Sequence, residues 1–355
     1  MANPIVSVLI DTYNHERFIA QAIESVLAQD FPRGDMEFLV VDDGSTDRTP
    51  DIVRKYEPQL RLIRKPNGGQ ASAFNAGIPH ARGEIVAFLD GDDWWAPEKL
   101  SRVAAAFAAD SALGIVGHGI TMVHRDGSHL TETLRKGFQF QANNIQGAQI
   151  LRCRGSFLGT SRMAIRSEIL RRIGPVPEAI RVQADEYLFT LAAVLAPARI
   201  LPEPLTFYRL HDANAFQLPV FDVARVRSKQ LSLASLVEAL ACELDRHGIE
   251  RRMRKVILEY TRAYANQLRL VVDGGWPWET FRTEWSLYHV TYPDASFSHL
   301  AFKIPIVLAS LAVPPRTYYN AQRSLSKWRF YQWVRRRVIP FPIQAHIQRE
   351  PQLRH

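Results

Sequence analysis

The amino-acid sequence predicts an α/β fold in its first half and helices in most of its second half. Four short apolar runs occur within the first 90 residues, and a helix-forming segment follows each of them. The runs lack the alternation of apolar and polar residues that a half-exposed strand shows, so both faces of each strand are expected to be covered. This pattern favours a largely parallel sheet between layers of helices.

The expected strands and helices alternate along the first 110 residues. Thr49 and Pro50 suit the N-cap and first residue of the second helix, and Gly83 suits the end of the third. Pro97 marks the start of the fourth helix. The expected strands are 5–14, 37–45, 60–65 and 84–90, and the expected helices are 16–29, 49–56, a helix within 67–83, and 97–109.

From residue 114 the pattern changes to strands of hairpin type, with a turn at 125–127. A helix at 185–196 and a strand at 198–211 complete the first domain, which we expect to span residues 1–215. Residues 216–355 are expected to form a helical C-terminal region that ends in a basic aromatic tail. Its predicted segments are the helices 223–246 and 250–272 and a Trp- and Tyr-rich stretch at 276–292.

The composition of this chain of 355 residues is that of an ordinary globular protein. Its two cysteines, Cys153 and Cys242, lack the spacing of a metal site and exclude a disulfide scaffold. The N-terminus meets Asp11 too early for a signal peptide, and the longest apolar run, 304–315, is too short to span a bilayer. We therefore expect a cytoplasmic protein.

The net charge of +8 is concentrated near the C-terminus. Residues 300–355 hold ten Lys and Arg side chains and one acid, Glu350, so the rest of the chain is close to neutral. Trp328, Tyr331 and Trp333 lie between these cations, which indicates peripheral attachment to anionic lipid on the inner face of the plasma membrane. The alternative is that the aromatic side chains pack on the first domain and the arginines are solvated.

Three of the expected strands end in polar clusters. These clusters are Asp11-Thr12-Tyr13-Asn14, Asp42-Asp43-Gly44-Ser45 and Asp90-Gly91-Asp92-Asp93. Ligands of open α/β sheets bind beyond the carboxyl ends of the strands, so all three clusters are expected to line one crevice. A solvated turn explains one such cluster but accounts poorly for three at equivalent strand ends.

The third cluster has the chemistry of a divalent-cation site. Asp90, Asp92 and Asp93 repel one another at the end of a buried strand, and Mg²⁺ or Mn²⁺ would offset that repulsion with oxygen ligands. A metal held by one or two carboxylates leaves room for a diphosphate and stabilises charge on it as a leaving group. The spacing does not fit an EF-hand loop.

The order of the motifs "SVLIDTYNHERF", "VVDDGSTDRT", "NGGQASAFNAG", "VAFLDGDDWWAPEKL", "QADEYLF" and "YRLHDAN" resembles the family 2 glycosyltransferases. The resemblance covers roughly residues 4–215. It implies the GT-A nucleotide-diphospho-sugar transferase fold, a Rossmann-like mixed sheet flanked by helices, here with a helical C-terminal extension. It also implies an inverting enzyme that uses Mn²⁺ or Mg²⁺.

The resemblance assigns the first two clusters to the nucleotide. Asp43 is expected near the base, whereas Asp42 either binds the nucleotide or orients the turn, and Tyr13 either covers the base or packs the loop. Family members more often have Pro or Thr where this chain has Asp11. The residues assigned to nucleotide binding are Asp11, Thr12, Tyr13, Asp42, Asp43, Asn67, Gly68, Gly69, Asp90 and Arg209. For the Asn-Gly-Gly turn, a simple helix start is the alternative.

The same resemblance assigns the metal and the catalytic base. Asp92 and Asp93 are placed on the metal side, with Asp90 more loosely attached, and His211 contacts the metal or the diphosphate unless it is merely structural. Arg209 is expected to neutralise phosphate charge. Asp185, with its neighbour Glu186, occupies the place of the base, and the alternative is that it only favours the helix N-terminus.

Two classes of function follow from these observations. The first is transfer of a sugar from a UDP- or dTDP-linked donor to a hydroxyl of a glycan or lipid-linked acceptor, in surface polysaccharide or glycolipid synthesis. The alternative is a non-enzymatic nucleic-acid-binding or scaffolding protein that uses the basic tail. The clustered carboxylates would repel a phosphate backbone, so no nucleic acid is expected.

A nicotinamide-dependent enzyme is disfavoured because no G-x-G-x-x-G follows the first strand. The sequence leaves the oligomeric state open.

Overall fold

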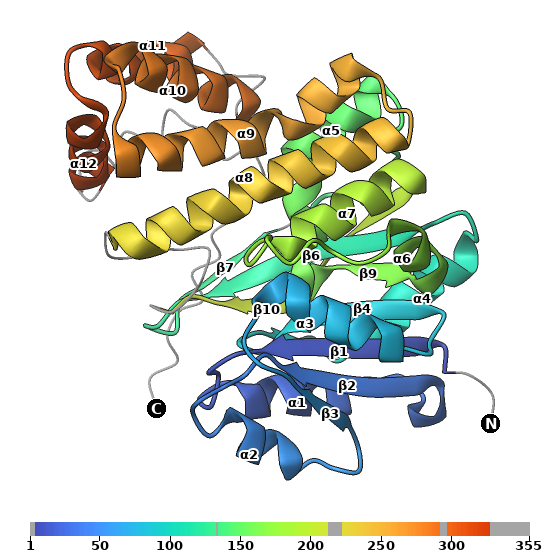
Figure 1. Ribbon diagram of the computed structural model, residues 1–355. Coiled ribbons are helices and arrows are strands. Elements are labelled where there is room, and N and C mark those ends of the chain that lie inside the picture. Colours follow the sequence, from blue (N-terminus) through green and yellow to red (C-terminus); the bar gives the residue numbers. More distant parts are fainter. Residues whose placement is uncertain (1–3, 133, 212–221, 292–296, 327–355) are drawn as a thin grey trace. The chain divides into compact units, whose positions relative to one another are not determined.

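The computed structural model of the chain describes residues 4–132, 134–211, 222–291 and 297–326. These residues form two compact units, one up to residue 211 and the other from residue 222 (Figure 1). The domain boundary expected at residue 215 falls outside the described residues. The same is true of Trp328, Tyr331 and Trp333 of the tail.

A mixed sheet forms the centre of the first unit (Figure 1). Its strands are β1 (Val6–Thr12), β2 (Met36–Asp42), β3 (Arg61–Arg64), β4 (Ile85–Asp90), β5 (Trp94–Trp95), β6 (Ile115–Val123), β7 (His129–Thr131), β8 (Phe138–Phe140), β9 (Ala164–Arg166) and β10 (Ala198–Arg209). They follow the order β3-β2-β1-β4-β9-β6-β10-β5, with β7 on β6 and β8 on β10. The first four are parallel and β9 is antiparallel to both its neighbours, which confirms the expected α/β class.

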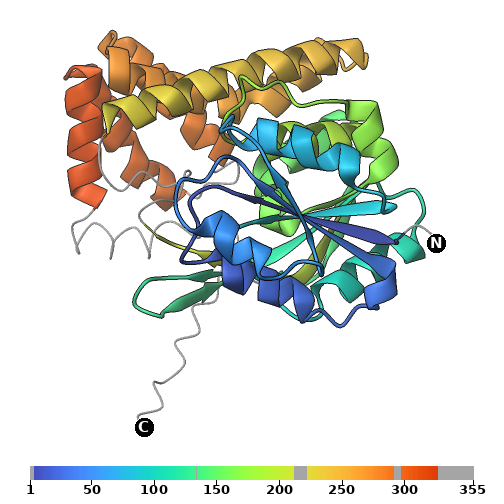
Figure 2. The same ribbon diagram turned by 60° about the horizontal axis from the view of Figure 1, so that its bottom comes forward.

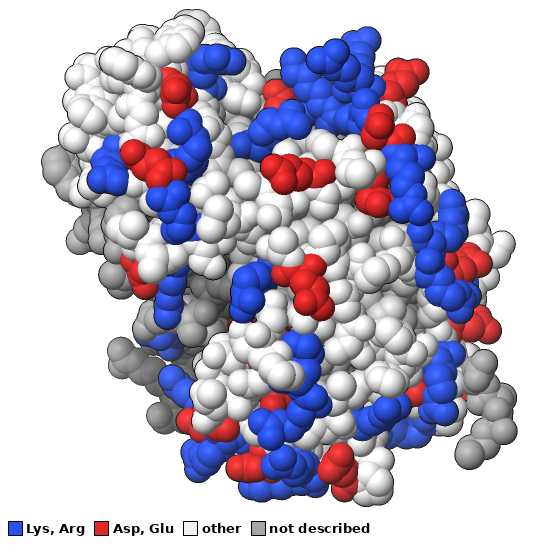
Figure 3. Space-filling model, in the orientation of Figure 1, with Lys and Arg blue, Asp and Glu red and all other residues white. Residues whose placement is uncertain are grey.

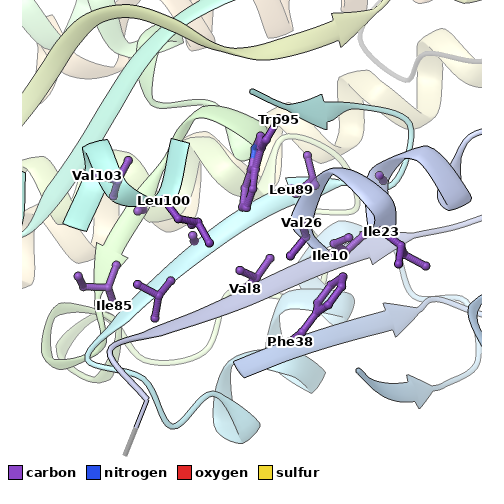
Figure 4. Packing of buried hydrophobic residues seen from close by; sticks show 14 of the residues in the cluster. Val8, Ile10, Ile23, Val26, Phe38, Ile85, Leu89, Trp95, Leu100 and Val103 are labelled. Atoms are coloured by element: carbon purple, nitrogen blue, oxygen red, sulfur yellow. The ribbon is translucent and has the colours of Figure 1, made fainter. Parts of the chain in front are cut away.

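Helices cover both faces of this sheet (Figure 2). They are α1 (Ile19–Leu27), α2 (Thr49–Arg54), α3 (Gln70–Gly77), α4 (Lys99–Ala109), α5 (Ile145–Arg154), α6 (Ser167–Ile173) and α7 (Ala184–Leu195). The apolar faces of α1 and α4 share one buried cluster with β1, β2 and β4. Figure 4 shows members of that cluster: Val8, Ile10, Ile23, Val26, Leu100 and Val103.

The opposite face of the sheet is covered by α3. Leu9 of β1 lies against the last turn of α3, and Phe88 of β4 contacts the ring of Phe74 at a centroid distance of 5.2 Å. Side chains alternate between the two faces of a strand. Asp11 and Asp90 therefore point to the same face as Leu9 and Phe88, the side on which α3 lies.

The start of α2 differs from the prediction. Arg48 is the N-cap residue, without a capping hydrogen bond from its side chain, and Thr49 is already helical. The Thr49 hydroxyl instead accepts a hydrogen bond of 2.8 Å from the backbone N–H of His15. The prediction of Thr49 as N-cap is wrong because a contact with the loop after β1 uses that hydroxyl.

The role predicted for Gly83 is also wrong. Helix α3 ends at Gly77, and a short 3₁₀ turn follows at Ile78–His80. Gly83 passes so close to β1 that a Cβ atom on it would lie 2.5 Å from the backbone nitrogen of Ser7. Its own N–H donates to the Ser7 hydroxyl at 2.8 Å. The glycine is therefore required by a close backbone approach and not by a helix end.

The second unit consists of helices. They are α8 (Val223–Arg246), α9 (Arg251–Asp273), α10 (Pro277–Thr291), α11 (Phe297–Leu308) and α12 (Pro315–Ser326), and the first two confirm the helices predicted at 223–246 and 250–272. Helix α8 buries leucines at helical spacing, namely Leu233, Leu236, Leu240 and Leu244. Helix α12 joins this unit through Tyr318 and Tyr319, which pack with Leu270 of α9.

The surface of the second unit is uneven in charge and polarity. Figure 3 shows Lys and Arg side chains gathered near the turn between α8 and α9. Large apolar side chains are exposed at the starts of α10 and α11: Trp276 is 76% exposed, Trp278 57% and Phe297 86%. Among the described residues, no helix combines the length and apolar character needed to cross a membrane.

We expect Gly83→Ala to destabilise the first unit. The new Cβ would meet the backbone of Ser7, which cannot move without disturbing the central strand, and overpacking of this kind typically costs about 1–3 kcal/mol. Urea denaturation followed by tryptophan fluorescence should show a lower midpoint. Gly34→Ala, at a position with no atom within 4 Å of the new Cβ, is the matched control. Equal midpoints for the two variants would contradict the close-approach explanation.

Candidate functional site

The strand register brings the three polar clusters to one edge of the sheet. Thr12 at the end of β1 pairs with Asp42 of β2, and Asp11 pairs with Asp90 of β4. Because β1, β2 and β4 are parallel, their carboxyl ends lie side by side. The chain segments that follow these strands therefore carry the predicted site residues into a common region.

The Asp-Gly-Asp-Asp segment forms a compact group of carboxylates. One oxygen from each of Asp90, Asp92 and Asp93 lies within 4.8 Å of the other two. Ser161, from the 3₁₀ turn Thr160–Arg162, donates to Asp93 Oδ2 at 2.6 Å and accepts from the backbone N–H of Asp90 at 3.1 Å. The backbone N–H of Arg209 donates to Asp93 Oδ1 at 2.9 Å. These bonds hold the group together without placing a full positive charge on it.

Two histidines lie beside Asp92. His211 Nε2 is 2.8 Å from Asp92 Oδ2, and His15 Nε2 is 3.9 Å from the same oxygen. Burial alone would raise the pKa of Asp92, but the hydrogen bond with His211 and the nearby His15 lower it. Burial lowers the pKa of His15, although the charge of Asp92 acts in the other direction. The two imidazoles therefore favour the ionised form of Asp92.

The other carboxyl groups of this region, Asp11, Asp90 and Asp93, have raised pKa values. Burial and the charge of Asp92 raise the pKa values of Asp11 and Asp93 well above the usual range. Burial and the charges of Asp11 and Asp92 do the same to the pKa of Asp90. Asp11 Oδ1 is buried and has no hydrogen-bond partner among the described residues. A buried group of hard oxygen atoms with excess negative charge fits a divalent cation such as Mg²⁺ or Mn²⁺.

Asp43 is occupied by the segment that follows β3. Its carboxylate accepts hydrogen bonds from the backbone N–H groups of Gly68 at 2.9 Å and Gly69 at 2.7 Å. Lys65 Nζ and Asn67 Nδ2 also donate to it, at 2.7 and 3.1 Å. The residues predicted to approach a phosphate or ribose, Asn67, Gly68 and Gly69, thus bind Asp43 in this structure.

Asp42 has a similar structural role. It is fully buried and accepts from the Ser45 N–H at 3.0 Å and from Arg64 Nε at 2.9 Å, so it orients the turn after β2. Thr12 is buried and its hydroxyl lies 3.2 Å from His15 Nδ1. Tyr13 is 42% exposed, so its ring is open to a ligand.

Arg209 joins the last strand of the sheet to the acidic group. Its Nε donates to the backbone oxygen of Asp92 at 2.9 Å, and its guanidinium lies over the rings of Phe18 and Trp94 at 4.8 and 4.5 Å. A further hydrogen bond goes to Gln21 Oε1. The side chain predicted to neutralise phosphate thus fixes the position of the Asp92 backbone in this structure.

Asp185 lies at the start of α7. Its Oδ2 accepts from the backbone N–H of Thr160 at 3.1 Å, and its Oδ1 accepts from the N–H of Glu186 at 2.9 Å. Burial raises the pKa of Asp185, and these hydrogen bonds offset part of that effect. The charge of Asp185 also raises the pKa values of Asp11 and Asp90, so it lies near the acidic group. Glu186 accepts from Gln183 at 3.2 Å.

Several residues of this region escape prediction from the sequence. Ser161 and Thr160 lie in a short turn between α5 and β9, and no local pattern marks them. His15 follows the first cluster directly, and its place after "DTYN" is a signal for a residue near the same strand end. Gln70, which hydrogen-bonds with Thr160 and with the backbone of Ala184, is visible in the sequence only as the first residue after the Asn-Gly-Gly turn.

Comparison with known sequences identifies the family. Residues 7–169 match the sequence profile described as Glycosyl transferase family 2. An uncharacterized glycosyltransferase of Nostoc sp. is 35% identical over 217 residues, which is 59% of this chain and 66% of that protein. The poly(ribitol-phosphate) beta-N-acetylglucosaminyltransferase TarS of Staphylococcus aureus is 30% identical over 260 residues, 68% of this chain but only 44% of TarS.

Solved structures share the fold. TarS 1–349 in complex with UDP-GlcNAc has a TM-score of 0.52 at 22% identity, covering 90% of this chain and 91% of that chain. The mannosyltransferase PcManGT of Pyrobaculum calidifontis, in complex with GDP-Man and Mn²⁺, has a TM-score of 0.53 at 22% identity, covering 94% and 84%. These likenesses confirm the GT-A fold with a helical C-terminal region. The profile match over residues 7–169 and the sequence relatives place the chain in the family 2 glycosyltransferases, which favours the enzyme over the nucleic-acid-binding alternative.

We expect Asp90→Asn to stabilise the protein when no metal is bound. A carboxyl group whose pKa is raised in the folded state holds its proton at pH values where the unfolded chain has lost it. The stability that Asp90 contributes is fully present below about pH 3.9, the pKa of Asp in the unfolded chain. It is lost as the pH rises through the higher pKa of Asp90 in the folded protein. At pH 7 in EDTA, scanning calorimetry should show a higher Tm for the variant than for the natural chain.

In Mn²⁺ the natural chain should have a higher Tm than Asp90→Asn, since a ligand that binds only the folded state raises its stability. We expect a higher Tm of the natural chain in Mn²⁺ and little or no gain for Asp92→Ala. Asp126→Ala, which removes an acid from the 125–127 turn, is the control and should gain as much as the natural chain. An equal gain for Asp92→Ala would place the cation elsewhere.

Proposed function

We propose that this chain transfers a sugar from a nucleotide-diphosphate donor to a hydroxyl group of an acceptor, with inversion at the anomeric carbon. The observation that carries the proposal is the pairing of two acidic features within one family 2 domain. Asp90, Asp92 and Asp93 form a group suited to a divalent cation, and a separate half-buried carboxylate, Asp185, lies nearby on α7. The first suits a diphosphate and the second suits removal of a proton.

The proposed donor site lies at the carboxyl ends of β1, β2 and β4. Mn²⁺ or Mg²⁺ held by Asp92 and Asp93, with Asp90 beside them, would supply charge stabilisation for the departing diphosphate. We assign Asp43 to nucleotide binding through the 65–69 segment that it holds, with Tyr13 open to the base. UDP or dTDP is the nucleotide we favour, supported by the UDP-GlcNAc complex of TarS, whereas the mannosyltransferase structure contains GDP-Man.

Asp185 is the proposed general base. Inversion requires the acceptor hydroxyl to attack from the side opposite the leaving diphosphate, and a base must take its proton. Burial raises the pKa of Asp185, which strengthens it as a base while the hydrogen bonds from Thr160 and Glu186 keep it oriented. The carboxylates of Asp42 and Asp43 are paired with Arg64 and Lys65 and are therefore unsuited to this role.

The proposed acceptor is a growing glycan or a lipid-linked glycan. A chondroitin synthase of Pasteurella multocida is 36% identical over 128 residues, and TarS is named for transfer to poly(ribitol-phosphate). These relatives support a polymeric acceptor in surface polysaccharide or glycolipid synthesis.

We further propose that the protein attaches peripherally to the cytoplasmic face of a membrane. The exposed indole rings of Trp276 and Trp278 and the ring of Phe297 suit the headgroup region, where aromatic side chains are favoured. Residues 300–355 add ten cations and one acid, and each cation near an anionic surface contributes about 1 kcal/mol, screened by salt. Attachment of this kind would bring the enzyme to lipid-linked acceptors.

A donor screen with catalytic variants tests the proposed reaction. Release of nucleotide from UDP-GlcNAc, dTDP-glucose and GDP-Man in Mn²⁺ should identify at least one donor, with water acting as acceptor. Asp185→Asn keeps the shape of the side chain and removes its basicity, so turnover should fall by about 10²–10⁴-fold. Calorimetry should show that the affinity for UDP in Mn²⁺ stays within about twofold, because the base does not hold the nucleotide.

Glu186→Gln is the matched control and should retain activity. If Glu186→Gln abolishes turnover while Asp185→Asn keeps it, the base is the neighbouring residue. If both variants remain active, the assignment of the acceptor side is wrong. A chain that releases nucleotide from none of the three donors, and binds UDP equally well in EDTA, would contradict the proposed function itself.

Vesicle sedimentation tests membrane attachment. The full chain should sediment with vesicles of phosphatidylglycerol and phosphatidylcholine at low salt, and less with phosphatidylcholine alone, because the attraction depends on anionic lipid. Deleting residues 327–355, which leaves α12 in place, should weaken binding, and Trp276→Ala with Trp278→Ala should weaken it further. If the chain sediments equally with neutral and anionic vesicles, or if the deletion leaves sedimentation unchanged, the proposed membrane attachment is contradicted. The alternative, in which the aromatic side chains pack on the protein, would then be favoured.

A further inference from the structure

Gln70 is the first residue of α3 and connects three parts of the site. Its Nε2 donates to the Thr160 hydroxyl at 3.0 Å and lies 3.5 Å from Asp90 Oδ1. Its Oε1 accepts from the backbone N–H of Ala184 at 2.8 Å. A single amide thus contacts the acidic group, the turn behind Asp185 and the first residue of α7.

The bond to Ala184 replaces a cap that α7 lacks. The first N–H groups of a helix have no partner within the helix and need an acceptor from elsewhere. The N-cap residue Gln183 has a left-handed backbone with φ of 60° and forms no capping bond with its side chain. Gln70 supplies an acceptor from another helix, so the position of α7 at Asp185 depends on α3.

The bond to Thr160 fixes the hydroxyl that faces Asp185. The Thr160 backbone N–H donates to Asp185 Oδ2 at 3.1 Å, and the Thr160 side chain is close enough to the carboxylate to lower the pKa of Asp185. When the hydroxyl oxygen accepts from Gln70, its own hydrogen is free to point at the carboxylate. The amide of Gln70 has only one orientation that satisfies both bonds, because its oxygen must face the N–H of Ala184.

Further contacts make the link between α3 and the chain before α7 rigid. The Gln70 N–H donates to the Arg181 carbonyl at 3.0 Å, and Asn75 exchanges two hydrogen bonds with the backbone of Val176, at 2.7 and 2.8 Å. Gly69, with φ of +87°, allows this approach, since a Cβ there would lie 2.6 Å from the Arg181 carbonyl oxygen. The segment 65–69, which hydrogen-bonds with Asp43, therefore leads directly into Gln70 and its contacts beside Asp185.

We propose that Gln70 is a positioning residue that holds the base Asp185 relative to the donor side of the site. The inference rests on the proposed function, in which Asp185 removes the acceptor proton. Gln70 itself is not expected to contact the acceptor proton or the diphosphate. It orients the carboxylate through Thr160 and sets the start of α7 through Ala184. Loss of the amide therefore misplaces the base without removing the groups that hold the nucleotide.

Steady-state kinetics on the full chain separates positioning from nucleotide binding. With the donor that the screen identifies, Gln70→Ala should lower kcat by on the order of 10²-fold, the cost of a misplaced catalytic group. The KM for the donor and the Kd for UDP in Mn²⁺ should stay within about twofold. Thr160→Val, which keeps the size of the side chain and loses the hydroxyl, should lower kcat in the same way.

Asn75→Ala is the matched control, because it breaks the two hydrogen bonds between α3 and Val176, away from Thr160, Ala184 and Asp185, and should keep kcat. In the Asp185→Asn background, Gln70→Ala should cause no further loss, since the two residues act as one unit. Additive losses, or a parallel loss of UDP affinity in Gln70→Ala, would overturn the proposal. Full activity of Asp185→Asn alone would instead overturn the assignment of the base.

Discussion

The repulsion among buried carboxylates at the ends of β1 and β4 is the constraint on which the rest of the site depends. Asp11 and Asp90 are paired by register and point to the same face, and Asp92 and Asp93 follow within three residues. Burial prevents water from screening their charges. The segments that partner this group come from distant parts of the chain, namely the turn at Thr160–Arg162 and the end of β10, so the sheet must bring these segments beside β4.

The two acidic clusters of the sheet differ in how their charge is compensated. Asp42 and Asp43 each pair with a cation from the end of β3, Arg64 and Lys65, and their oxygens are filled by hydrogen bonds. The group at Asp90–Asp93 receives hydroxyl, backbone and imidazole contacts instead. The first arrangement balances the charge of the carboxylates within the fold, whereas the second leaves negative charge that a bound cation can neutralise. Similar sequence patterns thus have different roles, which the charges around them reveal.

Much of this could be predicted from the sequence, because the signals are local. Strand and helix periodicity gave β1, β2, β4, α8 and α9 nearly in full, and the strand-end carboxylates are adjacent in the chain. The missed features depend on contacts between distant residues: the bonds of Asp43 with the 65–69 segment, the hydroxyl of Ser161, and Gln70 beside α7. Strands as short as β5 and β9 carry no periodicity at all.

The alternation of side chains along β1 and β4 also sorts the functional groups between the two layers of helices. Asp11 and Asp90 fall on the face covered by α3, where Gln70 and Asp185 also lie, whereas Thr12 contacts His15 ahead of α1 on the other side. A slip of one residue in the β1–β4 register would exchange these faces and separate Asp90 from Gln70. The burial of Val8 and Ile10 against α1 opposes such a slip, so the hydrophobic core fixes which carboxylates meet the base.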